Sequence, residues 1–580
     1  MSMLLEQFDS IFDTPESIDK LKELILDMAV KGNLVLQDEN DEPASVLLEK
    51  ILGEKERLIK EQKIKRVKPL PLIKEEENPY ELPKGWEWVR IIDICSVKGG
   101  KRVPRGYQLL DTPTEHAYIR ITNMKKGTIL LDNIKYIDNT IFEKISRYVI
   151  YKEDLYITIA GTIGGVGLIP KELDGMNLTE NAARIINCGA NKCYLYRCFS
   201  SKLVQDQFLS FVNQMAQPKL ALKRIETTLI PLPPLNEQKR IVEKVDQLMD
   251  FCEKLKERVE KKKKREDRLN VSALSSLEQS ITSEELKESL QFVLNNLSVL
   301  CTDTKHVQQL RNVILALAVK GKLVLQDEND EPASVLLERI AGSQEEIRKD
   351  QKQKIMQPFI KDKKDKASYE LPAGWIWVKL ASIISEPIRN GYSPKGVEYV
   401  TKVKNLTLTA TSSGYLKKEC FKYIDQEIDE VSHLWLEKGD ILVQRSNSLE
   451  LVGTSCIYDI EDKGYIYPDL MMKIKLSKNI DKKYIHFVLS SQMTKSYFRD
   501  NATGTSKSMP KINQKVLSDT LIPLPPLNEQ KRIVEKIDQF MSLCDEIEKQ
   551  IENINEQKEC LLQSVLRQEF QQQVREIIKA

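Results

Sequence analysis

The chain contains a long internal repeat, and this feature constrains its fold more than any other. Residues 25–51 (ILDMAVKGNLVLQDENDEPASVLLEKI) recur at 314–340 with 23 of 27 positions identical. The same offset of 289 relates YELPKGWEWV at 80–89 to YELPAGWIWV at 369–378. Because an internal repeat determines architecture before any local pattern does, the sequence predicts two structural units of one design.

A third block closes each repeat and leaves a dissimilar segment inside it. LIPLPPLNEQKRIVEKVDQLM at 229–249 returns at 521–541 with 19 of 21 positions identical. The enclosed segments, Arg90 to Thr228 and Lys379 to Thr520, are almost equal in length and hardly alike. Neutral divergence after a gene duplication would change the repeated blocks and the segments that they enclose to the same extent. We therefore expect the two middle segments to face different targets.

The sequence after each proline-rich block predicts a long helix. Apolar residues alternate in steps of four and three, the spacing of a coiled-coil seam. They are Ile241, Val245, Leu248, Cys252, Leu255 and Val259 in the first copy, and Ile533, Ile537, Phe540, Cys544, Ile547, Ile551 and Ile554 in the second. A helix over 528–577 would be ~75 Å long and needs a partner. We expect the two helices to pair antiparallel with their seams sealed against each other, and Asn236 and Asn528 to cap them.

The middle segments carry short strand-like runs, DLYITIA at 154–160 and DILVQ at 440–444, separated by glycine turns. This pattern favours mainly β domains with some helix. The predicted fold class is α+β, with two mainly β domains in tandem repeat joined by long helices that form an antiparallel coiled coil. The expected divisions are an N-terminal helical scaffold and linker (1–79), a first β domain (80–235), a central helical scaffold and linker (236–368), a second β domain (369–527) and a C-terminal long helix (528–580).

Composition narrows the class of protein. Hydrophobic residues make up 41% and charged residues 30%, the balance of a globular protein. The sequence lacks an apolar run of eighteen residues and begins with an acidic segment, so we expect a cytoplasmic location. Ten cysteines without a C-x-x-C pair and four widely spaced histidines give no reason to expect a metal site.

The order of these blocks carries a family resemblance. A GW-x-W-V block, a variable segment, the block LIPLPPLNEQKRIV and a long helix all occur twice, over essentially the whole chain. This order resembles the specificity subunit of type I restriction-modification enzymes. GGKRVPRGYQLL at 99–110 and LTENAARI at 178–185 in the first variable segment, and QRSNSLELVG at 444–453 in the second, also resemble that family's target-recognition domains.

The resemblance implies a division of labour among subunits. Each recognition domain would read one half of a split DNA target, and the coiled coil would set the distance between the halves. Two DNA-methyltransferase subunits would dock on the scaffold, and ATP-dependent restriction subunits would join them for cleavage. S-adenosylmethionine, ATP and magnesium would bind those partners, and this chain would hold no cofactor, no metal and no catalytic residue. The repeat agrees, since it generates approximate two-fold symmetry that suits inverted half-sites on a duplex.

Basic residues in the variable segments are the candidate phosphate contacts. The first domain (81–235) has a net charge of +6 and the second (370–527) of +3. Lys and Arg contacts to phosphates supply most of the affinity for DNA. In the first domain we expect such contacts from a glycine-rich loop and from the far end of the segment, and in the second from the matching end. The candidates are Lys98, Lys101, Arg102, Arg105, Lys219, Lys223, Arg224, Lys507, Lys511 and Lys515.

Base readers are expected among polar residues in loops. Arginine pairs well with guanine, and asparagine with adenine, in the major groove. The candidates are Arg120, Asn123 and Lys125 in the first domain, and Arg389, Asn405, Arg445 and Asn447 in the second. The run KKKKR at 261–265 is interpreted as a solvated helix face, with contact to the DNA between half-sites as the alternative.

Two other functions remain open from the residues alone. A stand-alone sequence-specific DNA-binding regulator would bind tightly without partner subunits. A metal-dependent nuclease would use Asp469, Asp481 and Lys483, which match a short P-D…D-x-K pattern in which paired carboxylates hold magnesium beside a phosphate. That pattern is short enough to arise by chance, so the nuclease is the weaker alternative.

Overall fold

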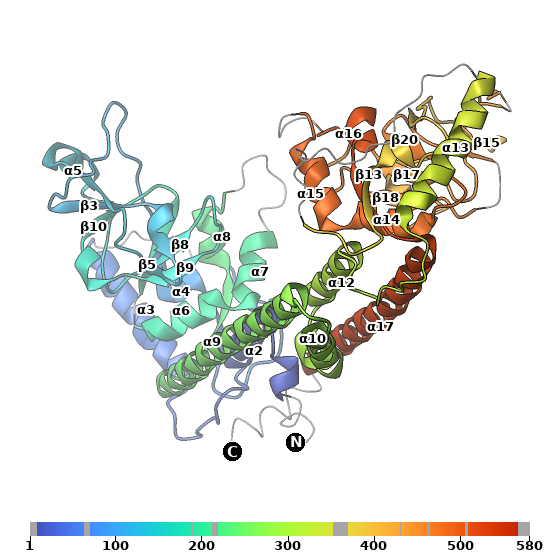
Figure 1. Ribbon diagram of the computed structural model, residues 1–580. Coiled ribbons are helices and arrows are strands. Elements are labelled where there is room, and N and C mark those ends of the chain that lie inside the picture. The colour runs from blue at the N-terminus through green and yellow to red at the C-terminus, as the bar shows by residue number, and fades with distance from the viewer. Residues whose placement is uncertain are drawn as a thin grey trace. The chain divides into compact units, whose positions relative to one another are not determined.

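The computed structural model describes residues 8–62, 70–187, 189–210, 219–351, 369–429, 431–460, 464–504 and 509–566. The chain divides into two compact units (Figure 1). Unit 1 comprises residues 1–263 and 556–580, and unit 2 comprises residues 264–555. Two long helices are shared between them. α9 (Leu235–Gln279) begins in unit 1 and ends in unit 2, whereas α17 (Leu527–Leu566) begins in unit 2 and ends in unit 1.

After helical residues 8–11, unit 1 contains two amphipathic helices, α2 (Pro15–Val30) and α3 (Ala44–Lys60). Thr14 caps α2, because its side chain accepts a hydrogen bond from the backbone N–H of Ser17. After the short helix η1 (Glu75–Glu77), strand β1 (Glu87–Arg90) pairs antiparallel with β12 (Leu229–Leu232). The repeated GW-x-W-V and proline-rich blocks therefore form a two-stranded ribbon through which the chain enters and leaves the first β domain.

The first β domain lies between the two strands of this ribbon and contains two sheets. Their strand orders are β2-β11-β8-β9 and β6-β3-β10-β7, and β4 pairs with β5 in a small hairpin. The strands are β2 (Cys95–Gly99), β3 (His116–Ile119), β4 (Met124–Lys125), β5 (Thr128–Ile129), β6 (Lys135–Ile137), β7 (Val149–Ile150), β8 (Leu155–Thr158), β9 (Val166–Leu168), β10 (Met176–Leu178) and β11 (Ala182–Asn187). The helices are α4 (Ile91–Ile94), η2 (Ile121–Asn123), α5 (Asn139–Ile145), η3 (Lys171–Leu173), α6 (Lys192–Ser200), α7 (Lys202–Ser210) and α8 (Leu222–Thr227).

Unit 2 follows the same plan. After α10 (Ser283–Asn295) and α11 (Leu297–Leu300), α12 (Thr304–Val319) and α13 (Ala333–Gln351) take the places of α2 and α3. β13 (Ile376–Lys379) and β21 (Leu521–Leu524) form the second ribbon. The second β domain contains β14 (Arg389–Asn390), β15 (Val403–Leu406), β16 (Phe421–Ile424), β17 (Ile441–Gln444), β18 (Ser455–Ile457), β19 (Tyr465–Ile466), β20 (Met471–Ile474), η4 (Leu380–Ser382), η5 (Leu408–Ala410), α14 (Lys482–Ser490), α15 (Gln492–Asp500) and α16 (Gln514–Ser518).

The two β domains share one topology although their sequences differ. The sheet β14-β20-β17-β18 matches β2-β11-β8-β9, and β16-β15-β19 matches three strands of the other sheet, β6-β3-β10. A buried ion pair recurs at the same place, Arg184 with Asp154 at 3.5 Å and Lys473 with Asp440 at 3.7 Å. The variable segments thus keep a common frame. In the described residues each domain combines sheets with helices, as expected, but helices cover about as many residues as strands, so the domains are mixed rather than mainly β.

The expected helix caps are wrong by two residues. α9 begins at Leu235, and the backbone N–H of Gln238 donates to the carbonyl of Pro234 at 2.9 Å. Gln530 donates in the same way to Pro526, so the prolines rather than Asn236 and Asn528 stand at the helix starts. Proline suits this position because its fixed φ and missing N–H cost nothing at the first turn.

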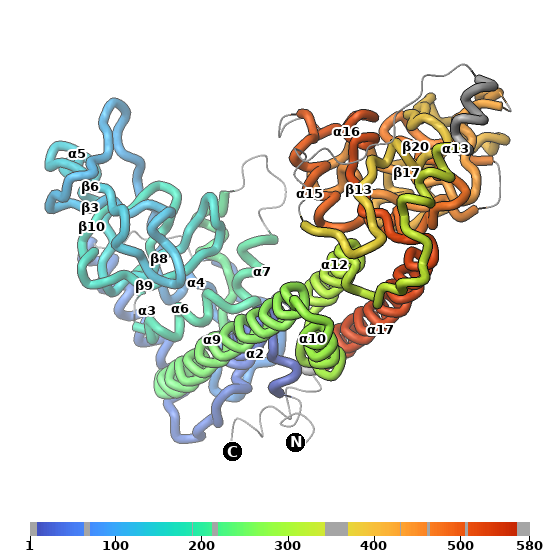
Figure 2. The backbone as a smooth tube through the Cα atoms, viewed as in Figure 1, coloured from blue at the N-terminus to red at the C-terminus, as the bar shows by residue number. Residues whose placement is uncertain are grey.

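The prediction that the two helical seams pack against each other is also wrong over most of their length. Val245 and Cys252 of α9 pack in one core with α2, and Ile537 and Cys544 of α17 pack in another core with α12. Figure 2 shows the backbone of α2 beside that of α9. Ion pairs reinforce each contact, for example Lys256 with Asp19 at 2.9 Å in unit 1. The reason is that α2 and α12 also have apolar faces, and each lies in the same unit as the seam that covers it.

Within each core, residues from the end of the other long helix complete the packing. Leu562 of α17 belongs to the unit 1 core, and Leu274 and Leu277 of α9 belong to the unit 2 core. α9 and α17 therefore share a core where one helix begins and the other ends. The predicted seam residues are otherwise buried or half-buried, with one exception: Ile554 is 50% exposed.

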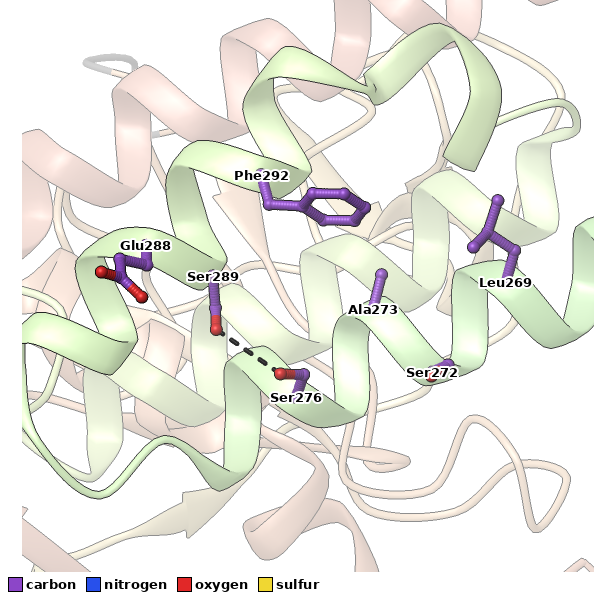
Figure 3. A pocket seen from close by; sticks show the side chains of 7 residues that line it. All are labelled: Leu269, Ser272, Ala273, Ser276, Glu288, Ser289 and Phe292. Carbon is purple, nitrogen blue, oxygen red and sulfur yellow. Dashed lines mark hydrogen bonds between the residues drawn. The ribbon is translucent and has the colours of Figure 1, made fainter.

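The end of α9 also packs beside α10 in unit 2 (Figure 3). Leu269, Ala273 and Phe292 line a pocket of about 380 Å³ between these helices, and Ser276 and Ser289 face each other across it at 3.5 Å. Serine and alanine make up most of the residues that line this pocket. Across the part of the chain that the structure describes, none of the helices is both long and apolar enough to traverse a membrane.

Candidate nucleic-acid interface

The glycine-rich loop that follows β2 has an equivalent after β14. The backbone N–H groups of Gly100 and Lys101 donate to the carbonyls of Ala182 and Leu178 at 3.0 and 2.9 Å. In the second domain Gly391 and Tyr392 donate to Met471 and Tyr467 at 3.2 and 2.9 Å. The same pair of hydrogen bonds therefore anchors the first loop of each β domain.

Only glycine fits at the start of these loops. A Cβ at Gly100 would lie 2.1 Å from the carbonyl oxygen of Thr179, and one at Gly391 would lie 2.0 Å from that of Tyr467. Both contacts are with backbone, which cannot move aside cheaply. The close approach fixes where each loop leaves its sheet, so the residues that follow are presented from equivalent positions.

An acidic residue braces each loop from the neighbouring strand end. Arg102 Nε donates to Glu180 Oε1 at 2.5 Å, and Ser393 Oγ donates to Asp469 Oδ1 at 2.5 Å. Burial of the Glu180 carboxyl opposes its ionisation, but hydrogen bonds from Arg102, from Thr179 and from its own backbone N–H, together with the charge of Arg102, outweigh this and lower its pKa. The bond to Glu180 raises the pKa of Arg102, so both groups stay charged at neutral pH.

Beyond this brace the loops expose cations and aromatic rings. Lys101, Arg105 and Tyr107 are exposed in the first domain, and Tyr392 and Lys395 are exposed in the second. Cations suit phosphates, and exposed tyrosines can contact sugars or bases. These side chains make the two loops the best candidate DNA contacts in the described parts of the β domains.

Lys395 occupies the position of Arg105 and was not among the residues predicted from the sequence. The signal was present in the sequence, since Pro104-Arg105-Gly106 matches Pro394-Lys395-Gly396. The match is easily overlooked because the two loops differ in length: Pro394 follows Gly391 by three positions, whereas Pro104 follows Gly100 by four. Tyr107, Tyr392 and Tyr399 were not predicted either, because only the structure shows that these residues are 37%, 41% and 56% exposed.

Several predicted contacts lie in strands rather than in loops. Lys98 is half-buried in β2 opposite Arg184, and Arg389 is exposed in β14 opposite Lys473, so the two are structurally equivalent. Lys125 is exposed in β4. The predicted loop placement of these residues is wrong because short paired segments continue the sheets there.

Two of the predicted base readers face the interior. Asn123 is 2% exposed and its side-chain amide donates to the carbonyl of Asp132 at 3.1 Å. Asn405 is fully buried in β15 and donates to the carbonyl of Tyr392 at 2.7 Å. In this structure both amides support the loops around them, and neither is presented to a base edge.

The other predicted readers lie nearer the surface. Arg120 is half-buried, and its guanidinium donates to the carbonyl of Asn133 at 2.9 Å. Arg445 and Asn447 are half-buried after β17, where Asn447 Nδ2 donates to Gln444 Oε1 at 2.7 Å. These contacts leave part of each side chain in solvent, so all three remain predicted DNA contacts.

The predicted backbone-positioning cations gather near the last helix of each β domain. Lys223 and Arg224 are exposed on α8, and Lys515 is exposed on α16. Two more, Lys219 and Lys511, are exposed just before these helices, while Lys507 lies outside the described residues. Their role stays a prediction.

Comparison with known proteins then assigns the family. The family model described as type I restriction modification DNA specificity domain matches residues 83–264 and 372–556. The chain is 33% identical to the type I restriction enzyme EcoAI specificity subunit of Escherichia coli, over 91% of this chain and 90% of that protein. This chain belongs to the type I restriction enzyme specificity subunits.

A second sequence relative agrees with this assignment. The EcoEI specificity subunit, also of Escherichia coli, is 31% identical over 92% of this chain and 91% of its own length. The crystal structure of the HsdS subunit from Thermoanaerobacter tengcongensis is more remote, at 19% identity and a TM-score of 0.40, covering 85% of this chain and 99% of that one. The assignment rests on the sequence relatives.

The residues of the nuclease alternative have structural uses in this specificity subunit. The carboxylate of Asp481 caps α14 by accepting from the backbone of Tyr484 at 3.1 Å, as Asn191 caps α6 by accepting from Tyr194. Lys483 pairs with Asp538 at 2.6 Å, and Asp469 is the loop brace described above. These contacts account for the P-D…D-x-K pattern without a metal.

One group of potential metal ligands occurs among the described residues. Asp267, Asp303 and His306 place their ligand atoms within 4.8 Å of one another. His306 is 1% exposed, and its Nε2 lies 2.8 Å from Asp267 Oδ1, while the Asp303 side chain accepts from the backbone of His306 as the cap of α12. The group is explained by hydrogen bonds that join the end of α9 to the start of α12. This contact was not predicted, because Asp267 and His306 lie far apart in the sequence.

Proposed function

We propose that this specificity subunit reads a bipartite DNA target, each β domain recognising one half. The observation that carries the proposal is the pair of equivalent loops, held by the same backbone bonds but exposing different side chains. Lys101, Arg102 and Arg105 occur in one loop, and Tyr392, Ser393 and Lys395 in the other. A common frame with different contact residues is what two readers of different half-sites require.

The long helices would set the spacing between the half-sites. α9 and α17 contain 45 and 40 residues, which corresponds to about 68 and 60 Å of helix. Each begins in one unit and ends in the other, as an antiparallel pair that links two readers would. Half-sites about one helical turn apart, or a multiple of it, present their major grooves on one side of the duplex. The exposed KKKKR run on α9 would then lie close to the intervening DNA.

The subunit would direct chemistry that its partners perform. Two DNA-methyltransferase subunits would methylate adenines in the target, and ATP-dependent restriction subunits would cleave DNA. S-adenosylmethionine, ATP and magnesium would bind to those partners, and this chain would contribute recognition and spacing.

Mapping of methylated adenines tests the proposal directly. The chain is expressed with its cognate methyltransferase subunit, and modified adenines are mapped across the host genome. The expected motif has two specific parts separated by a fixed number of unspecified bases. Exchange of residues 90–228 for the same segment of another specificity subunit should change one part only, and exchange of residues 379–520 should change the other. A continuous motif, or a motif in which one exchange alters both parts, would refute the proposal.

A further inference from the structure

The first turn of α9 contains two adjacent polar residues that are almost completely buried. Glu237 is 1% exposed and Gln238 is 0% exposed. Their counterparts at the start of α17, Glu529 and Gln530, are 1% and 0% exposed. Burial of a polar group costs free energy unless the group is hydrogen-bonded, so the partners of these side chains show what the burial achieves.

Gln238 joins the long helix to the first β domain. Its side-chain amide donates to the carbonyl of Pro233 at 2.8 Å, and its side-chain carbonyl accepts from the backbone N–H of Asn191 at 2.8 Å. Asn191 is the N-cap of α6, a helix of the β domain. One side chain therefore connects the start of α9 both to the segment that leaves the ribbon and to the domain itself.

Unit 2 contains the same connection. Gln530 donates to the carbonyl of Pro525 at 2.9 Å and accepts from the backbone N–H of Asp481 at 3.0 Å. Asp481 is the N-cap of α14, as Asn191 is of α6. Because the donor is a backbone N–H, the bond does not depend on the identity of the cap residue. It therefore recurs in two domains whose sequences differ.

Glu237 joins the same turn of α9 to the scaffold and to the entry strand. Its two carboxylate oxygens accept from Trp86 Nε1 at 2.9 Å and from Gln37 Nε2 at 3.2 Å. Trp86 precedes β1, and Gln37 lies in the loop between α2 and α3. Glu529 makes the two equivalent bonds in unit 2. The first turn of each long helix is thus bonded to the scaffold, to both ends of the ribbon and to the β domain.

The surroundings of the glutamine bond are retained in segments that otherwise hardly resemble each other. NKCY at 191–194 and DKKY at 481–484 keep a lysine and a tyrosine at the same positions. The hydroxyl of each tyrosine donates to a proline carbonyl in its ribbon, as Tyr194 does to Pro231 at 2.8 Å. The candidate DNA contacts of the two domains differ, whereas the attachment of each domain is the same.

Apolar packing and buried hydrogen bonds contribute differently to this attachment. Tyr194 and Leu195 of α6 share one core with residues of α2 and α9, so the domain is also held by apolar contacts. Apolar attraction is non-directional, and it permits small rotations of one part on another. A buried polar network is fully satisfied in one arrangement only. We therefore expect the core to hold the domain in place and the Gln238 bonds to fix its angle.

Recognition of a fixed spacer requires such an angle to be fixed. One additional base pair between two half-sites moves the second half-site by about 3.4 Å along the duplex and rotates it by about 35°. A subunit that rejects this spacer has to hold each recognition domain more tightly than that displacement. Helix length alone does not meet this requirement if the domain can rotate where it joins the helix.

We propose that Gln238 and Gln530 are positioning residues that fix the angle of each recognition domain on its long helix, and thereby the spacer length that the subunit accepts. The inference rests on the proposed function, which supplies two half-sites at a fixed separation. The long helices would provide the distance and the two glutamines the orientation. Since both side chains are fully buried, they would act without contact to DNA. Their loss should relax the choice of spacer and leave the choice of bases intact.

Substitution of the glutamines by methionine tests the inference. Methionine is unbranched and of similar length, so it fills the space but makes neither hydrogen bond. The full-length chain with Gln238→Met is purified with the cognate methyltransferase subunit. Methylation is measured on duplexes that carry the mapped half-sites with the native spacer or with a spacer one base pair longer or shorter.

The expected result is a loss of discrimination between spacers. The ratio of kcat/KM for the native spacer to that for an altered spacer should fall about tenfold, because one buried hydrogen bond and its orphaned partner are equivalent to about that factor. Gln530→Met should have the same effect, and the variant with both substitutions a larger one. Mapping of methylated adenines in cells should show unchanged half-site bases for each variant.

The matched control is Ser201→Ala, which removes a buried hydrogen bond inside the first β domain. Ser201 is 0% exposed, and its hydroxyl donates to the carbonyl of Cys198 at 2.6 Å. The bond does not reach α9, so the spacer ratio should stay at the wild-type value. Gln238→Asn is a second variant for the test, because it keeps an amide but is one methylene too short to reach both partners. Thermal unfolding followed by circular dichroism verifies that each chain is folded.

The outcomes separate this inference from the proposed function. A wild-type spacer ratio in folded Gln238→Met or Gln238→Asn overturns the inference, and so does an equal fall in Ser201→Ala. If neither glutamine variant folds, the residue is required for folding rather than for orientation, and the inference is overturned as well. If the wild-type motif has no fixed spacer, the proposed function itself fails. A folded variant with a relaxed spacer and unchanged half-sites supports the inference.

Discussion

Removal of Lys101 and Arg105 from the first recognition loop provides a quantitative test of the interface. Both side chains are exposed, whereas Arg102 between them is braced by Glu180 and is left in place. Each phosphate contact contributes about 0.9 to the slope of log K against log salt concentration. Loss of two contacts should therefore reduce the slope by about 1.8.

The same relation gives the loss of affinity. At 0.1 M salt a slope change of about 1.8 corresponds to about 60-fold weaker binding, or about 2.4 kcal/mol. The assay measures Kd for a duplex that carries the mapped target, between about 50 and 300 mM salt. It uses the complex with the methyltransferase subunit, with Lys101→Ala and Arg105→Ala in the same chain.

A control with the same change in charge lies outside the interface. Lys202 and Lys254 are exposed, and each forms an ion pair with an aspartate one helical turn away. Lys202→Ala with Lys254→Ala should leave the slope within error of the wild type. An unchanged slope in the loop variant, or an equal change in the control, would show that the loop makes no phosphate contacts and that the proposed interface is wrong.

Three further predictions concern stability and loop geometry. Ile537→Ala should destabilise unit 2 by about 2–5 kcal/mol in urea unfolding because the side chain is fully buried, whereas Ile554→Ala should cost less than about 0.5 kcal/mol; equal effects would contradict the seam packing described above. Burial lowers the pKa of His486 to about 4, so the folded chain keeps this residue neutral while the unfolded chain protonates it near pH 6.5. Stability should therefore fall by up to about 3 kcal/mol as pH drops from about 6.5 to about 4, and His486→Gln should lessen this fall relative to the wild type; identical pH profiles would exclude the burial effect. Gly100→Ala places a methyl group 2.1 Å from the Thr179 carbonyl and should displace the loop, weakening methylation of every site through the first half-site; unchanged methylation kinetics would show that the loop geometry is irrelevant.

The sequence by itself determined the architecture of this protein at the level of repeated parts. The identical blocks predicted two units of one design. The apolar residues spaced in steps of four and three predicted the long helices, because a helix repeats within a short stretch of sequence and its spacing can be recognised there. The dissimilar middle segments predicted two different readers. The order of the blocks also sufficed to indicate the family that the comparisons established.

The tertiary structure decided which residues face which partners. A heptad pattern indicates that a helix needs an apolar partner but does not identify it, and here α2 and α12 cover most of each seam. Polar residue type suggested Asn123 and Asn405 as base readers, but both are buried: Asn123 ends the short helix η2 and donates to Asp132, and Asn405 lies in the paired strand β15. The short match that contains Arg105 and Lys395 is present in the sequence, but the two loops differ in length, and only their matching backbone bonds show that the two residues are equivalent. Burial and equivalence depend on contacts between residues far apart in the chain, and local sequence patterns do not encode those contacts.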